Sequence, residues 1–323
     1  MKSGSTLEKV IASGKPAVTA ELGPPMSADP HEVVNKARML KGFCDAANIT
    51  DCQTAVVRIS SIAAGAIAFQ QGLEPVIQMT CRDRNRIAIQ ADLLGAAALG
   101  LKNCLCLAGD HQKFSAAGKL KGHPGAKNVY DVDTCQLVGI LKKMRDEGKQ
   151  EGGDPLEVAP KFFVGASWTP MGDPIDFRPI NLLKKVNAGA DFIQTQGIYD
   201  MTLFREQMAK IRNMGLHERT AILAGIIVPK SAMMLKYMDS SVAGVSVPKE
   251  LIDRMNKAKV AAGEDKKKMR ELQEQEGIKI AIELIHQALE TPGVKGVHIQ
   301  AIEWENAIEG IVKAAGLYPR PQV

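Results

Sequence analysis

Two acidic residues stand at the ends of short apolar runs, where chemistry-bearing side chains of an enzyme often lie. Glu21 lies near the end of AVTAEL (17–22), and the Gly-Pro-Pro sequence that follows cannot continue a strand. Asp110 follows Gly109, at the end of NCLCLAG (103–109). An acid in such a position can serve catalysis, but Glu21 could also cap a helix or pair with a lysine, and Asp110 could be a turn residue.

Polar residues also follow the other apolar runs. They are Thr50-Asp51, Gln78 with Thr80, Ser167-Trp168, Gln194 with Gln196, Pro229 and Gln300. Gln196 could simply satisfy backbone groups, and the methionines of SAMMLKYM (231–238) are typical of helix packing. Acids and amides gathered at the same ends of the runs indicate a site, although by themselves they name no reaction.

The elements that must position these residues are apolar runs separated by stretches with helical spacing. The eight runs are 17–22, 46–50, 75–80, 103–109, 161–167, 191–197, 221–227 and 296–302. Helical spacing is clear in 84–100 and 200–215, which both end in glycine, and Asp200 or Thr202 could begin the second helix. This order predicts a single-domain α/β protein over 1–323, a (β/α)8 TIM barrel with its reactive groups at the carboxyl ends of the strands. The alternative is an open doubly wound sheet.

Two segments are longer than the minimal repeating unit. Residues 111–130, rich in Gly and Lys, predict an extended loop after the fourth strand, on the active face, with a lid as one role. Residues 248–290 predict an extra helix before a long eighth helix. Neither segment requires a second domain.

Composition excludes several classes of protein. The chain has 323 residues, 45% of them hydrophobic, which is enough for a large core, but no apolar run reaches the 18 residues of a membrane span. A net charge of +5 and an aromatic content of 4% argue against nucleic-acid binding. The six cysteines form no CxxC pair, so we expect neither disulfides nor a metal site. The N-terminus lacks the apolar core of a signal peptide, and we expect a cytoplasmic protein.

Several of these motifs, in this order, resemble the methylenetetrahydrofolate reductase family. They are AELGPPM, NIT, QMTC, CLAGD, LLKKVNAGADFIQTQGIYD and GIIVP, and the resemblance extends from about residue 10 to about residue 320. It implies a flavin-dependent barrel that interconverts 5,10-methylenetetrahydrofolate and 5-methyltetrahydrofolate in one-carbon metabolism.

The resemblance also implies roles for individual residues. Glu21 matches the general acid that assists opening of the imidazolidine ring, a role that needs a raised carboxyl pKa. Asp110 matches an acid beside both flavin and pterin, and Gln196 matches an amide that binds the pterin. The positions implied for flavin contact are Thr50, Gln78, Gly109, Asp133, Thr134, Ala166, Ser167, Asn181, Lys184, Lys185, Ala190 and Asp191. The lysines suit a cofactor phosphate.

The chain departs from many relatives at several positions of these motifs. Leu22 and Gly23 replace two phenylalanines, Gln78 replaces a histidine, Ala108 replaces an arginine, and Arg178 replaces an acid. These changes leave the folate chemistry intact but leave the flavin open between FAD and FMN.

The electron donor is a separate question, because relatives that use NADH stack the nicotinamide on aromatic residues at the mouth. This chain has few aromatic residues there, although Tyr199 could still stack. The hypothesis is that a cysteine-rich metal-binding or iron–sulfur partner subunit supplies electrons to the flavin, and we expect an oligomer. A flavin-free pterin methyltransferase and a non-catalytic scaffold subunit are the alternatives.

Overall fold

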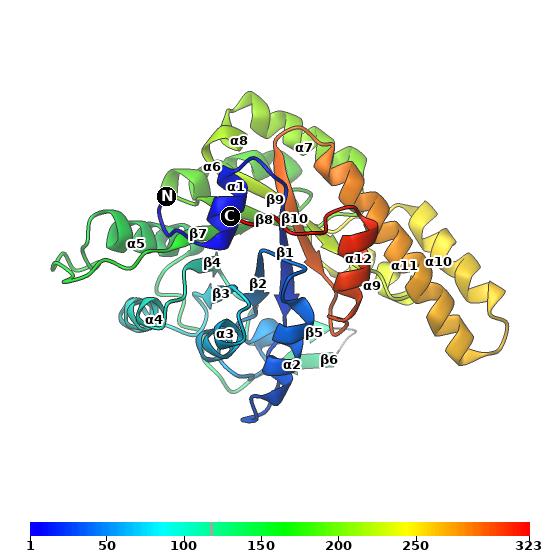
Figure 1. Ribbon diagram of the computed structural model, residues 1–323, viewed down its shortest axis with the longest axis horizontal. Helices are drawn as coiled ribbons and strands as arrows, with labels where there is room; N and C mark the ends of the chain where they lie inside the picture. The colour runs from blue at the N-terminus through cyan, green and yellow to red at the C-terminus, as the bar shows by residue number, and fades with distance from the viewer. Residues whose placement is uncertain (117–118) are drawn as a thin grey trace.

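The computed structural model describes residues 1–116 and 119–323, and its centre is a closed barrel of parallel strands (Figure 1). Around the barrel the strands follow the order β1-β10-β9-β8-β7-β4-β3-β2. Their bounds are β1 Ala17–Leu22, β2 Ala46–Ile49, β3 Pro75–Thr80, β4 Asn103–Leu107, β7 Phe163–Trp168, β8 Phe192–Gly197, β9 Ala221–Ile227 and β10 Val294–Gln300. Each matches one of the eight expected runs, so the predicted (β/α)8 barrel is confirmed.

Helices follow the strands and cover the outside of the barrel, except α1, which precedes β1 (Figure 1). They are α1 Thr6–Ala12, α2 His31–Leu40, α3 Ser61–Gln70, α4 Arg86–Ala98, α5 Thr134–Asp146, α6 Arg178–Ala188, α7 Met201–Asn213, α8 Leu216–Arg219, α9 Ala232–Ser241, α10 Lys249–Ala261, α11 Lys266–Leu289 and α12 Ala307–Ala314, with 3₁₀ turns η1 Gln53–Ala55 and η2 Ile175–Phe177. Among the described residues, no helix is both long enough and apolar enough to cross a membrane.

Local sequence explains where the two clearest helices begin and end. The Asn85 side chain accepts hydrogen bonds from the first free backbone N–H groups of α4, and Asp200 does the same for α7. Gly100 and Gly215 follow these helices with φ of +82° and +68°, a conformation that favours glycine.

The strand wall separates two apolar cores. Alternate residues that face outward, such as Ile49, Ile77 and Ile193, pack against the helices. The residues that face inward at the amino end of the barrel form the second core, which Leu7 and Val10 of α1 close from below. The lower part of the barrel interior is therefore filled, and a ligand can enter only from the carboxyl end.

A polar layer lies above the inner apolar core. Asn48 and Gln194 exchange two side-chain hydrogen bonds of 2.6 and 3.0 Å, and Gln194 also donates to the Thr19 hydroxyl at 3.1 Å. Thr19 in turn lies 3.0 Å from Nδ1 of His298. Burial lowers the pKa of His298 to about 3, so this imidazole is neutral and the layer carries no charge beneath the mouth.

The two long segments are resolved into regular structure. Residues 111–130 contain a hairpin of β5 (Lys113–Ala116) and β6 (Lys119–Gly122) that packs against η1, where the sequence indicated only a loop; residues 117 and 118 lie outside the described part. The extra helix expected in 248–290 is confirmed as α10, which lies along α11 on one side of the molecule (Figure 1).

Candidate active site

Glu21 lies at the carboxyl end of β1, half-buried at the mouth of the barrel. It lines a cavity of about 320 Å³ between the loops that follow β1, β2 and β10. The pKa of Glu21 is raised from 4.5 to about 7, mainly by burial and to a lesser extent by the negative charge of Glu305. A carboxyl group with this pKa is partly protonated at neutral pH and can therefore donate a proton there.

The Gly-Pro-Pro segment after Glu21 is held by its carbonyl groups. The Gly23 carbonyl accepts a hydrogen bond from Lys36 at 3.1 Å, and the Pro24 carbonyl accepts one from Arg58 at 3.0 Å. The Pro25 carbonyl accepts one from the Ile59 backbone at 3.1 Å. Because each successive carbonyl has a partner, the loop is fixed and so is the strand end that carries Glu21.

Asp110 lies in the loop after β4, and its carboxylate accepts a hydrogen bond from the Thr54 backbone at 2.9 Å. Cys52, Thr54 and Ala55 all have φ between +47° and +56°, a strained conformation for residues with side chains. Gly109 has φ of +87°, and a Cβ there would lie 3.0 Å from Arg82 and 3.1 Å from Thr80. The exposed Asp110 thus ties a strained loop to the mouth.

Three further residues of the expected site lie at strand ends on the same rim. Gln78 of β3 faces the barrel interior, and Thr50, directly after β2, donates a 2.8 Å hydrogen bond to Gln53. Gln196 is half-buried near the end of β8, where the register with β9 shifts between Gln194 and Gly197. Such a bulge re-aims side chains and is frequent beside active sites.

A second group of expected residues gathers beyond β7. Asp133 caps α5 in a capping box with Gln136, and Thr134 is the first residue of that helix. The Lys185 ammonium donates to the Ser167 carbonyl at the end of β7. Burial lowers the pKa of Lys185, and the neighbouring Cys135 opposes this shift. Asn181 and Lys184 lie on the same helix, α6, where Lys184 is 5.2 Å from the centre of the Phe177 ring.

Three expected residues do not join the mouth, which corrects the sequence-based assignment. Ala166 packs fully buried in the outer core against the helices. Asp191 directly precedes β8 and Ala190 precedes it in turn, so both lie at the amino end of the barrel, opposite Glu21. There the Asp191 carboxylate accepts hydrogen bonds from Arg145 at 2.6 Å and from the Val164 backbone at 2.9 Å, and it also pairs with Lys2.

Comparison with known proteins identifies the family of the chain. The family model described as methylenetetrahydrofolate reductase matches residues 6–316. The chain belongs to the methylenetetrahydrofolate reductase family. Methylenetetrahydrofolate reductase 1 of Schizosaccharomyces pombe is 25% identical over 76% of this chain and 36% of its own length. A probable methylenetetrahydrofolate reductase (NADPH) of Caenorhabditis elegans is 22% identical over 81% of this chain and 35% of its own length.

The chain therefore spans about a third of the length of these curated relatives. A solved structure with a similar fold is that of an uncharacterized protein from Clostridium thermocellum, with a TM-score of 0.61 and 14% identity. It covers 96% of this chain and 99% of its own. At this identity the likeness supports the barrel fold of the reductase family and nothing finer.

Sequence reasoning about this reductase-family chain missed the charged residues around Glu21. Lys36 of α2, Arg58 after η1 and Glu305 before α12 all line the same cavity as Glu21. Glu305 is 7% exposed and pairs with Lys36 at 3.1 Å. The signal available for Glu305 was its place in the loop after the eighth strand, because all such loops meet at the carboxyl face.

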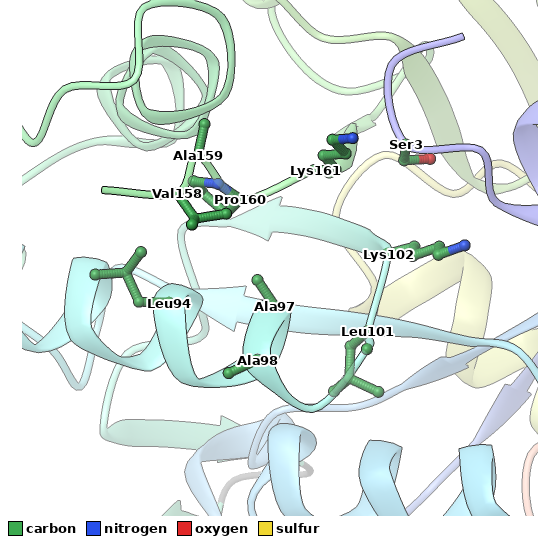
Figure 2. A pocket seen from close by; sticks show the side chains of 11 residues that line it. Ser3, Leu94, Ala97, Ala98, Leu101, Lys102, Val158, Ala159, Pro160 and Lys161 are labelled. Carbon is green, nitrogen blue, oxygen red and sulfur yellow. The ribbon is translucent and has the colours of Figure 1, made fainter. Parts of the chain in front are cut away.

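A larger cavity of about 510 Å³ lies at the opposite end of the reductase-family barrel. Figure 2 shows Val158, Ala159 and Pro160 facing Leu94 and Ala97 of α4 across it. Its lining carries no acidic side chain. Size alone therefore does not mark the site: the smaller cavity beside Glu21 has the groups that can transfer protons.

Proposed function

We propose that this chain reduces 5,10-methylenetetrahydrofolate to 5-methyltetrahydrofolate with a bound flavin, and that Glu21 is the general acid. The observation that carries the proposal is Glu21 itself, a half-buried carboxyl with a pKa of about 7 facing a cavity at the barrel mouth. Membership of the reductase family supplies the substrate.

Glu21 would donate its proton to a ring nitrogen of the folate, so that the imidazolidine ring opens and the one-carbon unit becomes a better hydride acceptor. Burial matters because it keeps the proton on Glu21 until the nitrogen is in place. The Gly-Pro-Pro carbonyls, each held by a hydrogen bond, keep the strand end rigid, and a rigid donor is an efficient one. Gln196 and Asp110 would bind the amino edge of the pterin.

The residues at the mouth fit a flavin. Lys185 of α6 is buried, and its ammonium reaches the end of β7. Lys184 directly precedes it and Asn181 lies about one helical turn before it, so these three residues could hold a cofactor phosphate. Gly109 has φ of +87° and a Cβ there would meet Arg82 and Thr80, so the turn that leads from β4 to Asp110 requires glycine. Thr50, Gln78, Asp133, Thr134 and Ser167 would complete the groove. The flavin, FAD or FMN, would supply the hydride.

The electron donor is proposed to be a partner subunit that binds metal or an iron–sulfur cluster, within an oligomer in the cytoplasm. The supporting observation concerns Tyr199, the aromatic residue that could have stacked a nicotinamide. Its ring is 2% exposed and its hydroxyl donates to the Ile227 carbonyl at 3.0 Å, so it packs in the core. Among the described residues, no group of three or more His, Cys, Asp or Glu side chains is arranged to hold a metal. The chain therefore offers neither a stacking surface at Tyr199 nor a described metal relay of its own.

A second candidate is a folate-binding barrel without flavin. The Clostridium thermocellum protein of similar fold is described as binding two copies of 5-methyl-5,6,7,8-tetrahydrofolic acid. An absorbance spectrum of the purified chain, with mass determination of any released cofactor, decides between the two. Flavin bands that bleach with dithionite and return when 5,10-methylenetetrahydrofolate is added support the reductase. Folate binding with no flavin, even after incubation with FAD and FMN, would leave the second candidate.

A further inference from the structure

The cavity beside Glu21 contains a second carboxylate for which the proposed reaction has no role. Glu305 is 7% exposed in the loop between β10 and α12. A buried carboxylate is costly unless a cation accompanies it, and here the cation is Lys36 of α2, 3.1 Å away. Among the side chains that the structure describes, Glu21 forms no ion pair with a cation, and its pKa responds to the charge of Glu305. Two carboxyl groups thus share one cavity in different environments.

Lys36 contacts both the loop that follows Glu21 and the Glu305 carboxylate. Its ammonium donates to the Gly23 carbonyl at 3.1 Å, two residues after Glu21, and also pairs with Glu32 at 3.0 Å. Burial acts to lower the pKa of Lys36, but Glu32 and Glu305 outweigh it, so the pKa is raised and the ammonium is charged. Its positive charge offsets the negative charge of Glu305, the carboxylate that it contacts.

We propose that Glu305 and Lys36 are positioning residues for the reaction at Glu21: Lys36 holds the Glu305 carboxylate in the cavity, and the negative charge of Glu305 favours the protonated form of Glu21. This inference rests on the proposed role of Glu21 as general acid. Pairs of carboxyl groups held in different protonation states by their surroundings are a general device of acid catalysis. Lys36 also joins the loop after β1, through the Gly23 carbonyl, to the loop after β10, through Glu305.

Other charged groups face the same cavity and must be counted. They are Glu32 on α2, Arg58 after η1 and Glu303 in the loop before α12, with the neutral His298 beneath. Glu32 has a side chain 52% exposed and Glu303 is an exposed residue, so water screens both more strongly than Glu305. The effect of Glu305 is therefore the one to test.

The experiment is a pH profile of single-turnover oxidation of the dithionite-reduced holoenzyme by 5,10-methylenetetrahydrofolate. Because Glu21 must be protonated, the rate constant is high below its pKa and falls above it. In Glu305→Gln we expect the midpoint of this fall to move down by roughly one pH unit, which lowers the rate about ten-fold at pH 8 and leaves it nearly unchanged at pH 5. Glu309→Gln removes an exposed carboxylate on α12 and serves as the matched control with an unmoved midpoint.

Two more variants make the result specific. Glu305→Asp keeps a negative charge in the cavity, so its midpoint should lie close to that of the wild type. Lys36→Met should move the midpoint much less in Glu305→Gln than in the wild type, because the carboxylate with which Lys36 pairs is then absent. Thermal melting confirms that each variant is folded.

The outcomes separate the two proposals. A midpoint unmoved in folded Glu305→Gln, while Glu21→Gln loses turnover, would overturn the role of Glu305 and leave the general acid standing. Near-normal turnover in Glu21→Gln would overturn the general acid itself. A uniform loss of rate at every pH in Glu305→Gln would make Glu305 structural and would also overturn the inference.

Discussion

The backbone of Thr54 donates a 2.9 Å hydrogen bond to the carboxylate of Asp110, so the loop after β2 is tied to the loop after β4. Both loops rise from the carboxyl end of the barrel. Thr54 has φ of +56°, and this bond helps to hold it in that strained conformation. Asp110 therefore has a structural partner as well as its proposed place beside the flavin and the pterin.

Asp110→Asn tests which of these roles matters. The amide oxygen can still accept from Thr54, so we expect little change in melting temperature. Removing the negative charge should raise the flavin potential by roughly 30 mV, since about 1.4 kcal/mol corresponds to that change for a two-electron couple. Folate binding should weaken as well. Spectroelectrochemistry and a folate titration measure the two, and unchanged values of both would place Asp110 outside the site.

Glu21→Gln should keep flavin and folate but lose most turnover, because the amide has the shape of the acid without its proton. General acid catalysis contributes on the order of a hundred- to ten-thousand-fold, which sets the expected loss. Reduction of the flavin by an artificial donor should be spared, since no folate is protonated in that half-reaction. Glu309→Gln, which removes an exposed acid on α12 outside this cavity, is the matched control.

The raised pKa of Glu21 also predicts a dependence of stability on pH. Below pH 4.5 the carboxyl is protonated in folded and unfolded chains alike. As pH rises from 4.5 to about 7 the unfolded chain ionises first, so folding stability is lost over that window, by up to roughly 3 kcal/mol for this side chain. Glu21→Gln should therefore melt several degrees above the wild type at pH 8 and close to it near pH 4.5. Calorimetry at the two pH values checks this, and an equal difference at both would show that the carboxyl is not desolvated.

Asp191→Asn tests the assignment of this residue to structure instead of cofactor. Asp191 and Arg145 form a buried ion pair, which this variant would break. Breaking such a pair lowers the free energy of unfolding by about 3–5 kcal/mol. Flavin content of the folded fraction should be unchanged. In Asp146→Asn the more exposed partner of Arg145 is lost, and the expected cost is below about 1 kcal/mol. Flavin loss in Asp191→Asn without destabilisation would return Asp191 to the cofactor site.

The proposed partner subunit predicts that NADH and NADPH are poor reductants of the isolated chain. Stopped-flow mixing of the oxidised flavoprotein with either nucleotide should show reduction far slower than folate turnover supported by an artificial donor. Flavin reduction at the rate of turnover by a nucleotide alone would rule the partner out as an obligatory donor.

The sequence by itself predicted a parallel sheet covered by helices and favoured the barrel. Apolar runs of the right length, separated by helices with caps such as Asn85 and Asp200, can bury both faces of the strands in a barrel or in an open doubly wound sheet, and eight such runs favour the barrel that the structure shows. The sequence also placed Glu21 at the carboxyl end of its strand, because the Gly-Pro-Pro segment that follows cannot continue the strand. The hairpin in 111–130 was not predicted, because its short strands carry no apolar alternation strong enough to distinguish them from a loop.

Only the tertiary structure decided what surrounds each strand end. The pKa of Glu21 depends on burial and on Glu305, which comes from the other end of the chain, and no local pattern encodes that distance. Tyr199 lies three residues after Gln196 in the sequence, yet its ring packs in the core and its hydroxyl donates a hydrogen bond to the Ile227 carbonyl. Asp191 shares a motif with Gln196, but a strand has two ends, and Asp191 lies at the one where Arg145 neutralises it. Proton affinity and pairing are set by neighbours in space, and these are fixed only when the barrel closes.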